Sequence, residues 1–134
     1  MFLKNMYLKH KKRKEFIDSI HKLKINKNIE SYKELCSFYD KLKDFVSSNK
    51  DYLINISDNM PRSQRIELRK YFDSVVIDFI DATKKSTGAL KKIVESDKIS
   101  DESKQKTIKY MESHINTAIS ATELMNTIHN VLSE

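Results

Sequence analysis

The chain has 134 residues, with one glycine, one proline and one cysteine, and its formal net charge at pH 7 is +6. This length is typical of one domain with a real core, so we expect residues 1–134 to form a single helical-bundle domain. The shortage of glycine and proline leaves few tight turns and favours long helices, and no segment has the polar–apolar alternation of a strand, so the sequence predicts no sheet.

Targeting signals are weak in this sequence. No apolar run approaches the roughly 20 residues that a bilayer-spanning helix needs. The first apolar residues come before the basic cluster, the reverse of the order in a secretory signal. Cys36 is alone, so no intrachain disulfide can form, which suits a reducing compartment. We therefore expect a cytoplasmic protein, and export by a route without a classical signal peptide stays open.

The positive charge is concentrated at the N-terminus. Residues 1–27 hold nine Lys or Arg and two acidic residues, whereas residues 28–134 hold 16 and 17. Only the first segment is therefore expected to attract an anionic partner.

The first predicted helix covers about residues 2–24. Phe16, Ile17, Ile20 and Leu23 lie on its apolar side and are expected to pack against the rest of the chain. Before them comes a basic cluster, which is either a solvent-facing stretch or a partner site. Its members are Lys9, Lys11, Lys12, Arg13 and Lys14.

The second predicted helix covers about residues 30–56, after a polar link at residues 26–28. Ser31 and Glu34 fit a reciprocal capping box, although Asn28 could cap an earlier start. Asn49 interrupts the apolar stripe, either as a polar residue at the helix edge or as a buried amide that sets the register.

The third predicted helix covers about residues 61–97, because Pro61 suits the first turn of a helix. Its apolar residues keep one helical phase within an arc of about 140° and make it the expected central helix, with Ile77 exposed on the opposite side. Gly88 either caps an earlier helix end or lies within one slightly bent helix that lets a neighbour approach; the resumed phase after it favours one helix. The residues of the arc are Leu68, Phe72, Val75, Val76, Phe79, Ile80, Leu90, Ile93 and Val94.

The fourth predicted helix covers about residues 101–132, with Ser100 as its cap and acidic residues in its first turn. It has two apolar seams, so either it is central or it has surplus surface for a partner. One seam contains Ile108, Met111, Ile115, Ala118, Thr122, Met125 and Leu132. The other supplies the candidate protein interface, namely Tyr110, Ala121, Leu124, Ile128 and Val131, and also includes Thr117. Together the four helices predict an all-α, elongated antiparallel bundle.

Metal ligands are not indicated by the histidine positions. His10, His21, His114 and His129 make no pair at helical ligand spacing, and no Glu-x-x-His occurs. His129, on an apolar seam, is expected to be partly buried and to pair with a neighbour. We expect no metal and no cofactor.

Catalytic motifs are also missing. There is no glycine-rich phosphate loop and no Gly-x-Ser-x-Gly, and Cys36 has no reactive context. Asp73, Asp78 and Asp81 are expected to form a solvated face that pairs with nearby lysines. The sequence therefore does not predict an enzyme.

The leading functional hypothesis is a helical module that binds another protein or a second copy of itself, as an adaptor, chaperone-like or accessory protein. The first alternative is a nucleic-acid accessory protein that grips phosphates through the basic cluster without sequence preference. The second is peripheral association with an anionic membrane. Long helices alone do not choose among these classes.

Overall fold

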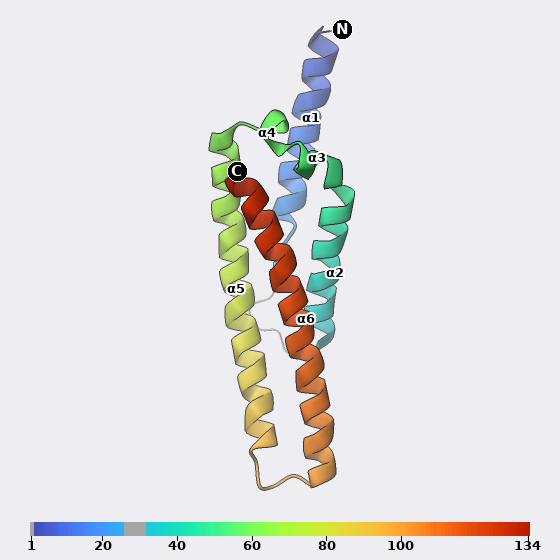
Figure 1. The fold of residues 1–134 in the computed structure, drawn as a ribbon, viewed down its shortest axis with the longest axis vertical. Helices are drawn as coiled ribbons and strands as arrows, with labels where there is room; N and C mark the ends of the chain where they lie inside the picture. The colour runs from blue at the N-terminus through green and yellow to red at the C-terminus, as the bar shows by residue number, and fades with distance from the viewer. Residues whose placement is uncertain (1, 26–31) are drawn as a thin grey trace.

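The computed structural model describes residues 2–25 and 32–134, and in these ranges it contains helices and no strand. The long helices run up and down an elongated bundle, which confirms the predicted all-α class (Figure 1). The helices are α1 (Phe2–His21), α2 (Tyr32–Ser48), α3 (Lys50–Ile54), α4 (Ile56–Asn59), α5 (Arg62–Val94) and α6 (Asp101–Ser133). The predicted cap at Ser31 and the link at residues 26–28 lie outside the described residues.

Unequal helix lengths give the bundle its shape. At a rise of about 1.5 Å per residue, α5 and α6 are each about 50 Å long, whereas α1 and α2 reach only about 30 and 26 Å. In Figure 1, α1 rises beyond the top of the bundle, and α5 and α6 continue downward as a hairpin past the lower end of α2. The upper part of the molecule therefore has four long helices side by side, and the lower part has two.

The core fills the upper part. Phe38 of α2 stacks on Phe79 of α5 with ring centroids 5.4 Å apart, and Phe16 of α1 stacks on Tyr52 at 4.5 Å. Ala82 is the last buried residue of α5, and the next buried side chain along the chain is His114 of α6. The lower hairpin thus contributes little to the core.

The centre of the bundle is the α5–α6 pair. α6 packs against both α5 and α2, while α5 packs against α6 and α1. The prediction of a single central helix beginning near Pro61 is therefore incomplete. α6 has two apolar seams because two different helices pack on it.

The predicted second helix is wrong as one continuous element, because it is divided at two asparagines into α2, α3 and α4. Asn49 has φ −114° and ψ 18°, and Asn55 has φ −105° and ψ 30°. The side-chain Nδ2 of Asn49 donates to the Phe45 carbonyl at 2.9 Å, and that of Asn55 donates to the Asp51 carbonyl at 3.1 Å. Such bonds compete with regular helix bonding.

The helix α5 is continuous through Gly88, as the favoured prediction had it, and it ends at Val94 rather than at 97. Gly88 does not have a positive φ, so the alternative of a helix end capped at Gly88 is wrong. A Cβ at Gly88 would meet nothing within 4 Å, so no neighbour makes the close approach that this glycine would allow.

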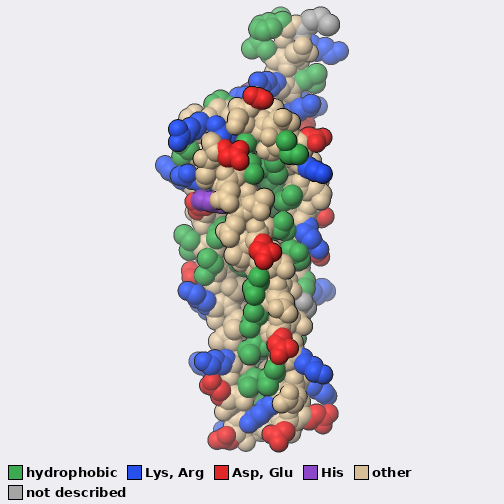
Figure 2. Space-filling view, in the orientation of Figure 1, with side chains coloured by type: hydrophobic (Ala, Val, Ile, Leu, Met, Phe, Trp, Pro, Cys, Tyr) green, Lys and Arg blue, Asp and Glu red, His purple; other side chains and the backbone are tan. Residues whose placement is uncertain are grey.

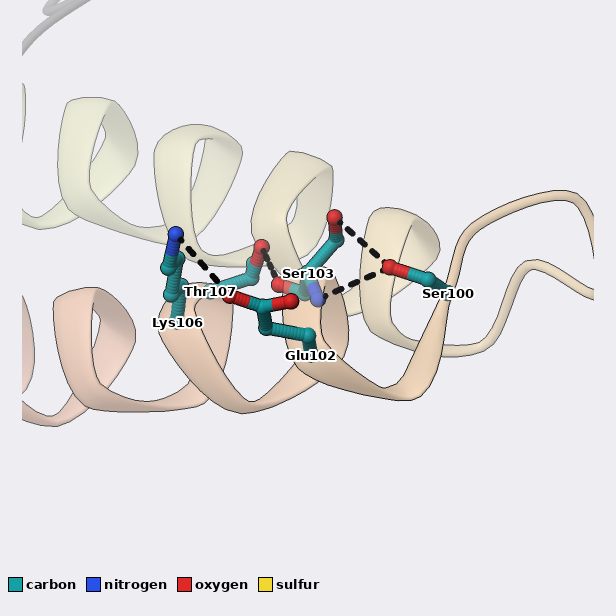
Figure 3. A network of polar contacts seen from close by, with 5 residues as sticks. All are labelled: Ser100, Glu102, Ser103, Lys106 and Thr107. Carbon is teal, nitrogen blue, oxygen red and sulfur yellow. Dashed lines mark hydrogen bonds and ion pairs between the residues drawn. The ribbon is translucent and has the colours of Figure 1, made fainter.

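The predicted cap of α6 is confirmed. The Ser100 Oγ accepts a hydrogen bond from the Ser103 backbone N–H at 3.2 Å and donates to Ser103 Oγ at 3.0 Å (Figure 3). One turn later, Lys106 pairs with Glu102 at 3.5 Å, and Thr107 Oγ1 donates to the Ser103 carbonyl at 2.9 Å. These local bonds fix where α6 leaves the turn at the lower end of the hairpin.

Candidate functional site

The basic cluster lies on the part of α1 that projects from the bundle. Every side chain from Phe2 to Lys12 is exposed, and so is Lys14. Arg13 differs, because it is half-buried and its Nε donates to the Asn59 carbonyl at 3.2 Å. The structure therefore leaves four of the five predicted basic residues free of the core and uses Arg13 to attach α1 to the corner near α4.

Large apolar side chains are exposed on the same projecting segment. Phe2 and Leu3 are 75% and 79% exposed, and Met6, Tyr7 and Leu8 are also exposed. On the same helix, Phe16 and Ile20 are buried, as predicted. α1 thus combines an anchored end with an uncovered apolar and basic end.

The predicted protein interface on α6 is not an outer surface. Ala121 and Ile128 are completely buried, and Leu124 and Val131 are half-buried against the core. Only Tyr110 is exposed, on the lower hairpin. Most of this set therefore packs inside the bundle, on a helix that contacts both α2 and α5.

The uncovered apolar surface lies instead between α5 and α6, and we call it the α5–α6 groove. It is an open groove of about 480 Å³. In Figure 2, hydrophobic side chains form a line along the lower part of the visible face, over these two helices. From α5 it is lined by Phe79, Ile80, Thr83, Lys84, Thr87, Gly88 and Lys91. From α6 it is lined by Ile115, Ala118, Ile119, Thr122 and Glu123.

Three isoleucines make the groove apolar. Ile80 and Ile115 are more than a third exposed, and Ile119 is half exposed. The phase of α5 predicts that Ile80 and Ile93 pack inside, but both are exposed, and the groove at Ile80 is lined by α5 and α6 alone. Ile77 is exposed, as predicted.

The rims of the groove carry opposite charges. Lys84 and Lys91 lie along α5, where Lys91 also pairs with Glu95 at 3.9 Å, and Glu123 lies along α6. Glu112 is exposed and falls three residues before Ile115, so it lies on the same side of α6. The groove is therefore basic along one edge and acidic along the other.

Two histidines connect α5 to α6. His129 Nδ1 lies 2.7 Å from Asp73 Oδ1, which confirms the expected partly buried and paired histidine. His114 is buried, and its Nε2 lies 2.7 Å from Ser86 Oγ. Burial lowers the pKa of His114 and favours its neutral form. Sequence reasoning missed the Ser86–His114 pair, because nothing in the spacing relates two residues on different helices.

Both uncovered regions carry exposed apolar side chains beside charged ones. In the described part of the chain, no three His, Cys, Asp or Glu side chains converge on a point where a metal ion would fit. None of the helices within residues 2–25 and 32–134 has both the length and the apolar character needed to cross a bilayer. The fold and these surfaces define a helical bundle with two uncovered apolar regions.

The chain was compared with known protein families, proteins and structures. No protein-family model, no curated protein and no solved structure matches the chain.

Proposed function

We propose that the chain is a non-enzymatic, cytoplasmic interaction protein that pairs with a second copy of itself through the α5–α6 groove. The observation that carries the proposal is the uncovered line of Ile80, Ile115 and Ile119 along the two helices that form the centre of the bundle. A helix laid along such a groove buries its own apolar stripe there, as in other helix-in-groove complexes.

The charged rims favour a second copy as the occupant. In a two-fold dimer each surface patch meets its own equivalent. A two-fold axis along the groove sets the α5 rim of each copy over the α6 rim of the other. Lys84 and Lys91 of one copy then face Glu123 and Glu112 of its partner, so the surface is complementary to itself.

The amount of exposed surface supports a partner as well. The chain exposes 9145 Å² at a mass of 15.8 kDa. A compact monomer of this mass exposes about 7,300 Å². The elongated shape contributes to this excess, and packing two hairpins side by side removes part of it.

The test is a charge exchange followed by analytical ultracentrifugation. Lys84→Glu places an acidic side chain opposite Glu123 of the partner, and Glu123→Lys places a basic one opposite Lys84. Each variant alone is therefore expected to dimerise at least about tenfold more weakly than the wild type. An equimolar mixture of the two variants is expected to recover the dimer, because opposite rims then face each other.

Ile119→Gln removes apolar contact from both halves of the interface and is expected to weaken the dimer by about tenfold or more. The matched control is Ile54→Gln, at an isoleucine that is 69% exposed on α3, away from the groove. A wild-type chain that stays monomeric at about 1 mM, where the association free energy is weaker than about −4 kcal/mol, contradicts the proposal.

A further inference from the structure

We propose that the projecting end of α1 attaches the protein end-on to an anionic membrane surface. This attachment goes beyond the pairing of copies through the α5–α6 groove, and it uses a different part of the molecule.

The projecting segment has its own arrangement along the helix axis. The large apolar side chains lie in the first two turns, from Phe2 to Leu8. The exposed lysines follow at positions 9, 11, 12 and 14. At about 100° per residue these lysines point to all sides of the helix and form a ring below an apolar tip.

The direction of this segment is set by the bundle. Arg13 bonds to the Asn59 carbonyl at 3.2 Å, and Phe16 stacks on Tyr52 at 4.5 Å. The helix therefore leaves the bundle from a fixed base, and the tip is the part of α1 that reaches farthest from the bundle (Figure 1).

A flat anionic surface fits the ring better than a nucleic acid does. A duplex beside the helix meets only the lysines on one side. When the helix approaches a lipid surface end-on, all four lysines of the ring lie at a similar depth, because residues 9–14 span only about 8 Å of helix axis. The apolar residues 2–8 span about 10 Å, which matches the depth of about 5–10 Å that apolar side chains reach at the headgroup boundary.

Three further groups of charges lie near the ring. Glu15 is exposed directly after Lys14 and sets one negative charge against the four lysines. Lys4 lies within the apolar tip, and its long stem lets the ammonium group reach the headgroups. The corner beside α1 carries exposed Lys50 and Arg62 together with exposed Asp51 and Asp58, and so adds no net charge. A cytoplasmic membrane leaflet has the negative surface potential that the lysine ring requires.

The first experiment measures flotation of the full chain with vesicles of phosphatidylcholine alone or with phosphatidylserine added. The wild type is expected to float only with the anionic vesicles. Changing Lys9, Lys11, Lys12 and Lys14 to Gln is expected to weaken this binding at least about a hundredfold, since each lysine near an anionic surface contributes about fivefold. Arg13 stays unchanged because it bonds to Asn59.

The matched control removes the same charge elsewhere, at exposed Lys70, Lys85, Lys92 and Lys109, and is expected to keep most of the vesicle binding. Equal binding by the wild type and the ring variant overturns the proposal. Binding to short DNA or RNA without binding to vesicles also overturns it and assigns the ring to phosphates of nucleic acid, where about three contacts predict a log–log salt slope near −2.7.

The second experiment tests the end-on geometry with single tryptophans, since the chain contains none. Leu3→Trp and Asn5→Trp place the indole about 160° apart around the helix. On anionic vesicles, end-on attachment shifts the fluorescence of both to shorter wavelength by similar amounts. A shift for Leu3→Trp alone means that the helix lies flat, and overturns end-on attachment.

Discussion

His114 and His129 lie on the same helix, yet their surroundings differ. His129 is half-exposed beside the carboxylate of Asp73, whereas His114 is buried beside the hydroxyl of Ser86. A buried hydroxyl does not offset the cost of desolvating a protonated imidazole. Protonation of His114 therefore opposes folding.

The buried His114 predicts that stability falls on acidification. Its pKa in the folded chain lies below the unfolded value of about 6.5, so the unfolded chain takes up the proton first as the pH falls. The free energy of unfolding should decrease as the pH falls through about 6.5, and this contribution should level off below the folded-state pKa. Urea denaturation at about pH 7.5 and pH 5.5 measures the change.

His114→Gln replaces the imidazole with an amide that can bond to Ser86 but cannot titrate, so the variant should lose less stability on acidification than the wild type does. His10→Gln is the control, because His10 is exposed on the projecting part of α1. An equal loss in wild type and His114→Gln would show that other groups cause the acid sensitivity.

At the scale of the helices, sequence predicted those helix ends that neighbouring residues determine. Pro61 precedes α5 and Ser100 caps α6, because each acts on residues next to it in the chain. The breaks at Asn49 and Asn55 were not predicted, since an asparagine in a helical stretch either bonds to a backbone carbonyl or points to solvent. Which of the two an asparagine does depends on the packing around α3 and α4. There the Tyr52 hydroxyl donates to the Asn59 carbonyl and Asn59 Nδ2 donates to the Tyr52 carbonyl, both at 3.2 Å.

The continuity of α5 predicts that Gly88→Ala is stabilising. Glycine within a helix costs roughly 0.5–1 kcal/mol relative to alanine, and an added Cβ here meets nothing within 4 Å. The midpoint of thermal unfolding should rise by roughly 2–4 °C. Scanning calorimetry measures the shift at a low concentration of chain, where the groove is unoccupied. A lower midpoint would mean that α5 needs the freedom of glycine at this position.

At the scale of the whole molecule, sequence predicted the class of fold and the basic segment but not the uncovered groove. The positive charge of residues 9–14 follows directly from the sequence, and its exposure to solvent does not depend on how the other helices pack. Whether Leu124 and Ile128 face a partner or the core depends on which helices pack on α6, and both α2 and α5 do. Ile119 is exposed although Ala121 beside it is buried, because the two residues lie on opposite sides of α6.

The lower part of the bundle, where only α5 and α6 are present, is expected to open without unfolding of the upper part. No side chain between Thr83 and Ser113 is buried, so few tertiary contacts oppose local opening there. Amide hydrogens near Leu90 and Ile108 should exchange with deuterium sooner than those near Phe72 and Met125, although they belong to the same two helices. Mass spectrometry of peptides from exchanged protein measures the difference, and uniform protection along α5 and α6 would contradict it. The hairpin then behaves as a separate, weaker cooperative unit whose protection rises when a partner occupies it.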